Sequence, residues 1–364
     1  MQIDALAATP SRSALASVYA CDRSERDACL SDIVLCNSTG NIQVDHILQG
    51  IVGLYECVFP DYIRAYYVIG SYADATTVPL SDIDLVIVFA KPLTSAQLTQ
   101  AHALAQHSAL ISPIRLDIGL TLEGNLSGSE CTLLKLGSLF LYGNDLRDTL
   151  ELPPLDQYQR DVTWSPYRFL GQVIREAMVL AYPLAYPDAT DPFYGYTRKR
   201  IAAWYPEAVE QGTKELITGA TRTATALLAL RARQYAGSKR GSIRLYREHI
   251  GDVWSEYLET LYRKGKGDWQ YAIPEHPADQ ALLRDLCQHT LHFENHYFQY
   301  YRSYLLELLH GTDAERLFAA QRLAQVVYAD AEMTGVLQQN AQAASAEVRL
   351  AAIQALEHIG KKDT

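Results

Sequence analysis

The sequence has few cysteines, and none is spaced as a zinc ligand. Six cysteines are spread over 364 residues without any Cys-x-x-Cys pair, the spacing typical of structural zinc sites. They are also too sparse for a disulfide scaffold in a chain of this length. We therefore expect reduced thiols and a cytoplasmic location.

Long apolar runs are missing as well. No stretch approaches the roughly 20 consecutive apolar residues that span a bilayer, and the N-terminus lacks the basic segment and apolar core of a secretory signal. Hydrophobic residues make up 48% of the chain and charged residues 20%, as in ordinary globular proteins. The sequence therefore predicts a soluble protein with no membrane partner.

Positive charge is also in deficit. The 42 acidic residues outnumber the 32 lysines and arginines, which gives a net charge of −10. Broad binding to nucleic acid needs a basic surface, so we expect none here. A local basic pocket for a nucleotide remains compatible with this charge.

The most informative stretch lies between residues 68 and 89. A β-rich apolar run ends at Gly70-Ser71, and after a polar turn Ser81-Asp82-Ile83-Asp84 leads into a hydrophobic strand. Because side chains alternate along a strand, Asp82 and Asp84 are expected on one face. Adjacent carboxylates repel each other unless a cation lies between them or one keeps its proton. The sequence therefore predicts a Mg²⁺ site here, with a solvated surface turn as the alternative.

A third carboxylate follows in a later strand. Asp117 lies within the alternating apolar run 114–122, and a buried strand seldom carries an acid without a partner. Gly-Ser after one strand, Asp-x-Asp entering the next, and an acid in a third occur in this order. The pattern resembles the polymerase-β-like nucleotidyltransferase superfamily over residues 42–150.

The resemblance implies a Mg²⁺-dependent enzyme that moves a nucleoside monophosphate from a nucleoside triphosphate to a hydroxyl group. ATP is the expected co-substrate, and AMP the expected group. By this resemblance Asp82, Asp84 and Asp117 are the catalytic, metal-binding carboxylates. Asp117 would either bind a second ion or act as the general base.

The resemblance also implies residues that bind the nucleotide. Gly70 would let the backbone approach the triphosphate without a Cβ clash, and Ser71 would donate hydrogen bonds to its phosphates. Ser81 would either bind phosphate or close the turn. Lys239 follows a Gly-Ser between two helical patterns, a segment similar to one in streptomycin-type adenylyltransferases where a lysine meets the phosphates. The alternative for Lys239 is a solvated helix end.

The periodicity predicts an α+β fold: a small mixed β-sheet core with flanking helices, followed by an all-α helical bundle. We divide the chain into an arm (1–40), a catalytic domain (41–152), a bundle (153–311) and a tail (312–364). In the first half, one helix is expected to open at Asn41 or at the preceding Ser-Thr-Gly, and another to be capped by Thr94-Ser95. In the second half, helices are expected over residues 167–180, 208–236, 242–262 and 279–309.

The tail contains two similar segments. They begin at Ala314 and Ala346, 32 residues apart, and their small residues and leucines at helical spacing resemble HEAT repeats. Residues 312–364 would then offer a face to the bundle or to a protein partner. Plain additional bundle helices are an equally good interpretation.

The two-domain layout is similar to that of aminoglycoside nucleotidyltransferases, which act in antibiotic resistance. We therefore expect a small-molecule hydroxyl acceptor, such as an aminoglycoside, in the cleft between the domains. An acidic cleft would suit a cationic aminosugar. Transfer to a protein or a tRNA, of a regulatory or toxin-antitoxin type, is an alternative, and so is a catalytically idle binding module.

Overall fold

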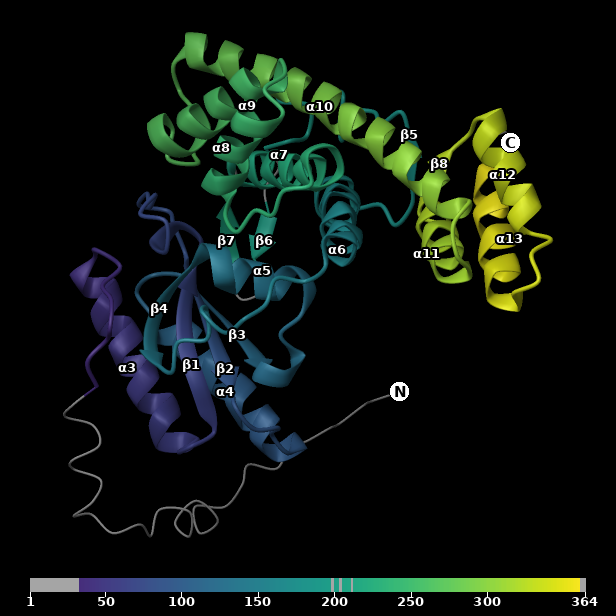
Figure 1. The fold of residues 1–364 in the computed structure, drawn as a ribbon. Helices are drawn as coiled ribbons and strands as arrows, with labels where there is room; N and C mark the ends of the chain where they lie inside the picture. The colour runs from purple at the N-terminus through teal and green to yellow at the C-terminus, as the bar shows by residue number, and fades with distance from the viewer. Residues whose placement is uncertain (1–32, 198–199, 203–204, 211, 361–364) are drawn as a thin grey trace, which may run out of the picture.

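The computed structural model describes residues 33–197, 200–202, 205–210 and 212–360. A four-stranded mixed sheet with flanking helices is followed by a mostly helical region (Figure 1). The predicted α+β fold class is therefore confirmed. The helical region also contains two short two-stranded ladders, which the sequence did not predict. The arm at residues 1–32 lies outside the described residues.

The sheet has the strand order β3-β2-β1-β4. Its strands are β1 (Ile63–Ile69), β2 (Ile83–Phe89), β3 (Leu116–Leu122) and β4 (Ser138–Gly143). β1 runs antiparallel to both β2 and β4, whereas β2 and β3 are parallel. The register pairs Ile69 with Asp84, and Asp84 with Asp117. The end of β1 and the beginnings of β2 and β3 therefore meet at one edge.

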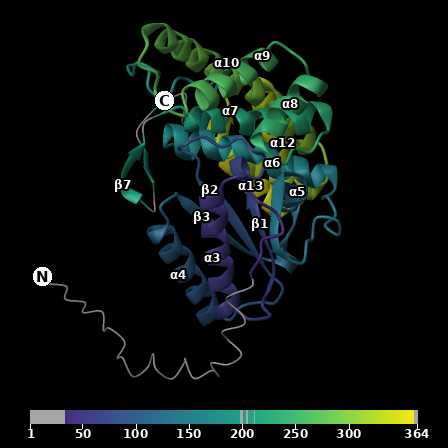
Figure 2. The same cartoon turned by 90° about the vertical axis from the view of Figure 1, so that its left-hand side faces the viewer.

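Helices cover both faces of this sheet. α3 (Ile42–Val58) and α4 (Ser95–Ile111) lie on one face (Figure 2), in a shared core with Tyr66 and Val68 of β1. α5 (Gly128–Gly137) packs on the other face, against Ala65 and Tyr67. Because successive side chains of β1 point to opposite faces of the sheet, this strand contributes to the hydrophobic core on both faces.

The predicted starts of the first two helices are confirmed. The Asn41 side chain accepts hydrogen bonds from the backbone N–H groups of Gln43 and Val44, and Thr94 forms a capping box with Gln97. These bonds satisfy N–H groups that have no partner within the helix.

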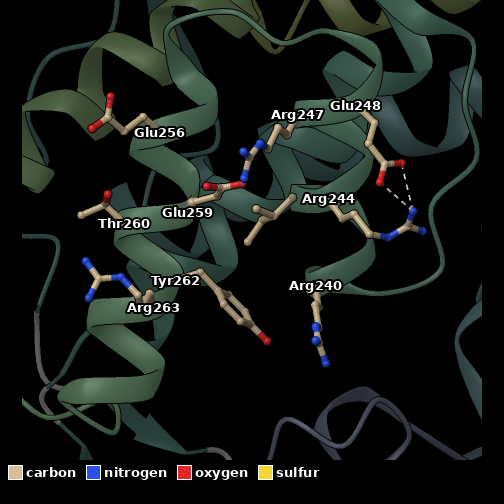
Figure 3. Close-up of a pocket in the computed structure, with 10 residues that line it drawn as sticks. Arg240, Arg244, Arg247, Glu248, Glu256, Glu259, Thr260, Tyr262 and Arg263 are labelled. Carbon is tan, nitrogen blue, oxygen red and sulfur yellow. Dashed lines mark hydrogen bonds and ion pairs between the residues drawn. The ribbon is translucent and has the colours of Figure 1, made fainter.

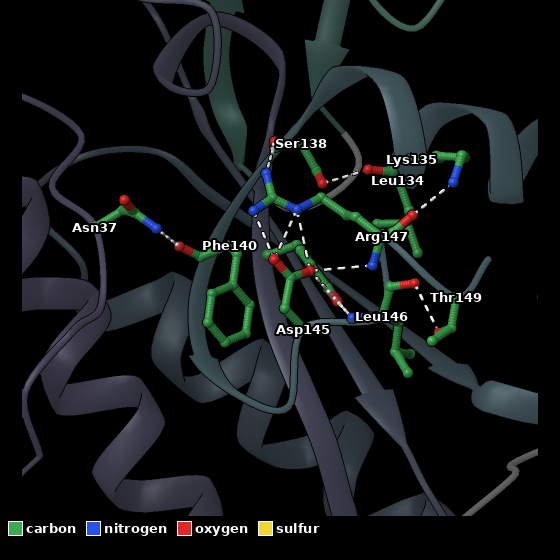
Figure 4. Close-up of polar contacts among 10 residues, drawn as sticks. Asn37, Leu134, Lys135, Ser138, Phe140, Asp145, Leu146, Arg147 and Thr149 are labelled. Carbon is green, nitrogen blue, oxygen red and sulfur yellow. Dashed lines mark hydrogen bonds and ion pairs between the residues drawn. The ribbon is translucent and has the colours of Figure 1, made fainter.

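The turn after β4 is held against the core by polar contacts (Figure 4). Asp145 Oδ2 pairs with Arg147 Nη2 at 2.6 Å, and the Tyr67 hydroxyl donates to Asp145 Oδ1 at 3.2 Å. Asn37 Nδ2 donates to the carbonyl of Phe140 at 2.9 Å. The segment before α3 is thereby fixed along β4.

The second half is built from helices with irregular ends. The helices are α6 (Leu155–Arg168), α7 (Lys214–Leu227), α8 (Lys239–His249), α9 (Trp254–Tyr262) and α10 (Pro277–Leu309). π-helical segments extend three of them, over Phe169–Arg175, Leu228–Ala232 and Arg263–Asp268. Within the described ranges, no helix has both the length and the apolar character needed to cross a membrane.

Three of the four helices expected in this half differ from the structure. The helix expected at 167–180 begins earlier, at Leu155, and its π-helical extension ends at Arg175. The helix expected at 208–236 is shorter at both ends, because β7 (Tyr205–Glu210) precedes α7 and a left-handed residue, Arg233, ends its extension. The helix expected at 242–262 is two helices, α8 and α9, separated at Gly251. The fourth helix, expected at 279–309, is confirmed as α10.

The tail is continuous with this helical region. It consists of α11 (Asp313–Leu323), β8 (Val326–Tyr328), α12 (Ala331–Asn340) and α13 (Ala346–Gly360). β8 pairs in parallel with β5 (Leu180–Tyr182), and buried side chains of the tail belong to the same core as those of α7 and α10. The HEAT-like repeat and its protein partner stay predictions. The other ladder joins β6 (Arg200–Ala202) to β7.

Candidate functional site

The three predicted carboxylates, Asp82, Asp84 and Asp117, lie together where β2 and β3 begin. We call this end of the sheet the carboxylate edge. Asp82 immediately precedes β2, Asp84 is its second residue, and Asp117 is paired with Asp84 in the register of β2 and β3. Asp82 and Asp84 are half-buried, whereas Asp117 is exposed. Burial, reinforced by the charges of Asp82 and Asp117, raises the pKa of Asp84 to about 7. The carboxylates at this edge therefore repel one another, and burial further disfavours the charged form of Asp84.

Gly70 lies so close to the Asp84 carboxylate that a side chain at this position would collide with it. Its φ is +71°, and a Cβ at this position would lie 2.6 Å from Asp84 Oδ2. Both the left-handed backbone and the lack of space exclude other residues without a shift of the carboxylate. Gly70 therefore sets how closely the turn after β1 approaches Asp84.

The turn that follows Gly70 is held by its own hydrogen bonds. Ser71 is half-buried, and its carbonyl accepts from the N–H of Thr76 at 3.0 Å. Ser81 is 4% exposed; its hydroxyl accepts from the N–H of Val78 at 2.9 Å, and its own N–H donates to the carbonyl of Val78 at 2.8 Å. Of the two roles expected for Ser81, the structure shows the closing of the turn.

Lys214 contacts the carboxylate edge directly, and the sequence analysis missed it. Its Nζ lies 2.9 Å from Asp82 Oδ2, with side-chain exposures of 22% and 20%. Burial alone would raise the pKa of Asp82, but the charge and hydrogen bond of Lys214 outweigh it and lower that pKa. The helix expected over residues 208–236 contains Lys214 in its interior, whereas in the structure Lys214 is the first residue of α7.

Lys239, the predicted phosphate-binding lysine, lies near the same edge. It is the first residue of α8, and its Nζ donates to Thr218 Oγ1 at 2.9 Å. The residue is exposed to solvent, yet desolvation by the surrounding protein and the charge of Lys214 lower its pKa, against the opposing charges of Asp82 and Asp84.

A third lysine, also missed, connects the helical region to the turn after β1. Lys266, in the π-helical segment after α9, is 5% exposed and donates from Nζ to Thr76 Oγ1 at 2.8 Å. The Tyr262 hydroxyl donates to the same oxygen at 3.3 Å. Desolvation lowers the pKa of Lys266 to about 8, although Asp74 acts in the opposite direction. Sequence spacing gave no signal for this contact.

Replacing Lys266 by methionine should remove a pH dependence of stability. Its pKa is about 8 in the folded protein against an ordinary 10.5, so the unfolded chain binds more protons between these values. The free energy of unfolding of the wild type should therefore rise across this range, by about 3 kcal/mol from this group. Denaturant unfolding from pH 8 to 10.5 measures it.

Lys264→Met is the matched control for that measurement. Lys264 lies in the same segment, is paired with Asp268 at 3.0 Å, and is more exposed than Lys266. The Lys264→Met variant should keep the rise in stability, whereas the Lys266→Met variant should lose it. An undiminished rise in the Lys266→Met variant would contradict the assignment.

A cleft of about 290 Å³ lies beside Lys239, between α5 of the core and helices α6, α7 and α8. Its lining carries charges of both signs, from Glu130, Asp161, Arg222 and Lys239. Arg222 Nη1 donates to Ser165 Oγ at 2.6 Å across this cleft. Lys239 therefore belongs both to the cleft and to the surroundings of the carboxylate edge.

A wider cavity, of about 640 Å³, lies between α8 and α9 (Figure 3). Its charges are largely paired with each other: Arg244 with Glu248 at 2.9 Å, and Arg247 with Glu259 at 2.8 Å. None of the predicted site residues lines it. We therefore centre the candidate site on the carboxylate edge.

The carboxylate edge fits a hard divalent cation by its chemistry. Asp82 and Asp84 offer oxygen ligands, and Mg²⁺ is bound by one or two carboxylates together with substrate phosphates more often than by a cage of protein ligands alone. In the described part of the chain, no three acidic, histidine or cysteine side chains are grouped as they would be around a bound ion. Burial is the main cause of the raised pKa of Asp84, and repulsion by Asp82 and Asp117 adds to it; a bound cation would relieve that repulsion.

The chain has a distant structural match but no matching family. No family model matches it, and no curated protein matches its sequence. One solved structure similar to it is a spectinomycin adenyltransferase from Enterococcus faecialis with ATP and spectinomycin. The match covers 68% of this chain and 98% of that chain, with 12% identity and a TM-score of 0.40.

Proposed function

We propose that this protein is a Mg²⁺-dependent nucleotidyltransferase that moves AMP from ATP onto a hydroxyl of a small molecule and releases pyrophosphate. One observation carries the proposal: the carboxylates Asp82 and Asp84 meet lysines from the helical region. Lys214 bonds Asp82 at 2.9 Å, and the charges of Lys239 and Lys266 act on the same carboxylates. A metal–triphosphate complex needs both signs of charge within one site.

The carboxylates and the lysines would bind different parts of the Mg²⁺–ATP complex. Asp82 and Asp84 would hold Mg²⁺, which when bound neutralises phosphate charge and stabilises the attacking and leaving oxygens. The lysines would bind the phosphates. Lys214 and Lys239 are the first residues of α7 and α8, and the positive end of a helix dipole favours an anion at that position.

In the proposed reaction, the acceptor hydroxyl oxygen attacks the α-phosphorus in line with the bond to the leaving pyrophosphate. A new oxygen–phosphorus bond forms, the bond to the bridging oxygen breaks, and the acceptor loses its proton. Asp117 is exposed and in register with Asp84. It would take that proton as general base, or bind a second ion while the proton passes to solvent.

The cleft beside Lys239 supports a small-molecule acceptor. Its volume of about 290 Å³ lies just below the roughly 300–1,000 Å³ of most ligand pockets. Glu130 and Asp161 on its wall would attract amino groups, as on an aminoglycoside. Arg222 and Lys239 on the same wall would stay with the nucleotide phosphates.

A mass-shift screen tests this function. The purified protein is incubated with Mg²⁺, ATP and separate pools of aminoglycosides, lincosamides and small molecules from a cell extract. We expect one acceptor to gain the mass of an AMP group, with an equal amount of pyrophosphate released. If no pool gains mass and the protein does not bind Mg²⁺–ATP in calorimetry, the proposal is wrong.

A further inference from the structure

The contact between Lys214 and Asp82 occupies a carboxylate that the proposed function assigns to the metal. Nζ of Lys214 bonds Oδ2 of Asp82 at 2.9 Å, and both side chains are about one-fifth exposed. An ammonium group and a divalent cation compete for the same carboxylate oxygen, because each is drawn to it and each repels the other. A cation on Asp82 would therefore weaken the bond to Lys214 by charge repulsion and favour another anion as the partner of Lys214.

Lys214 is placed where its own helix does not favour it. It is the first residue of α7, at the positive end of the helix dipole, where a cation is destabilising. The backbone there is fixed from outside the helix: Thr213 N donates to the carbonyl of Tyr271 at 2.7 Å, and Thr213 Oγ1 donates to the carbonyl of Gly265 at 3.2 Å. The charge of Lys214 is therefore compensated from outside its own helix, in this structure by Asp82.

The neighbours of Lys214 favour an anion as its second partner. Lys239 and Lys266 are near enough that their charges and that of Lys214 disfavour one another. These ammonium groups gather around few carboxylates, so that removing Asp82 as a partner leaves the group over-positive. Lysine has a long stem and three donors that reorient easily, and the triphosphate is the anionic ligand of the proposed reaction.

We propose that Lys214 exchanges partners: it bonds Asp82 in the free protein and moves to the triphosphate when the metal and nucleotide bind. This inference rests on the proposed function. It makes Lys214 a nucleotide-binding residue and also a competitor of metal binding in the absence of nucleotide. The two roles predict opposite effects of removing its charge.

Binding measurements on the full chain separate these effects without an activity assay. Mn²⁺ alone is titrated by electron paramagnetic resonance, and Mg²⁺–ATP by calorimetry, for the wild type, Lys214→Ala and Lys214→Gln. In both variants Mn²⁺ should bind about tenfold more tightly and Mg²⁺–ATP about tenfold more weakly, a size typical of coupling between two bound ligands. Lys214→Arg, which keeps the charge, should shift neither affinity by more than about threefold.

The double variant Lys214→Ala/Asp82→Asn, compared with each single variant and the wild type, completes a double-mutant cycle. The gain in Mn²⁺ affinity should vanish in it, because the gain requires the Asp82 carboxylate. Unchanged or weaker Mn²⁺ binding in folded Lys214→Ala and Lys214→Gln would overturn the inference, and so would unchanged Mg²⁺–ATP binding. If the variants show the gain in Mn²⁺ affinity but the wild type binds no Mg²⁺–ATP, the nucleotidyltransferase proposal itself is overturned.

Discussion

Asp84→Asn should lower the rate of nucleotidyl transfer about a thousandfold, the loss expected when a group that stabilises transition-state charge is removed. Asp84 lies in β2 between Asp82 and Asp117, and burial together with those charges raises its pKa to about 7. Asparagine has the same shape but no charge, so it holds a divalent cation far less well. The protein should nevertheless stay folded, because the amide relieves a repulsion among carboxylates.

Pyrophosphate release at saturating ATP and acceptor measures the effect, and thermal unfolding checks the fold. Asp148→Asn is the matched control: Asp148 is an exposed aspartate of the same core, outside β2 and β3. That variant should keep the full rate and the melting temperature of the wild type. Transfer by Asp84→Asn at more than a tenth of the wild-type rate would remove Asp84 from the catalytic role.

Gly237→Ala should both destabilise the protein and slow it. A Cβ at Gly237 would lie 2.6 Å from the carbonyl carbon of Leu136 and 2.7 Å from the backbone nitrogen of Gly137. Backbone atoms cannot give way as a side chain does, so α5 and the loop before α8 must separate. Overpacking of this kind costs about 1–3 kcal/mol. Since Lys239 follows two residues later, we expect transfer to fall about a hundredfold, as a displacement of about 1 Å can cause.

Denaturant unfolding and initial rates on the same preparations check both effects. Gly335→Ala is the control, because Gly335 lies in α12 and a Cβ there meets no atom within 4 Å. That variant should gain up to about 1 kcal/mol from helix propensity and keep the wild-type rate. Wild-type stability and rate in Gly237→Ala would show that the loop before α8 does not need its close approach to α5.

The sequence alone determined the elements of the core and the order of its functional residues. Side-chain alternation placed Asp82 and Asp84 at the start of a strand, and capping patterns placed the starts of α3 and α4 at Asn41 and Thr94. These signals are local: a strand repeats every second residue, and a cap acts within its first turn. Neighbouring residues therefore suffice to identify them.

Only the tertiary structure decided which cations meet those carboxylates. Lys214 reaches Asp82 across 132 positions of the chain, and Lys266 reaches Thr76 across 190. Neither lysine carries a local signature, and the start of α7 depends on Gly212, where a Cβ would lie 2.1 Å from the carbonyl of Tyr271. Contacts so distant in sequence are set by how the helical region packs on the core, which no pattern of neighbouring residues encodes.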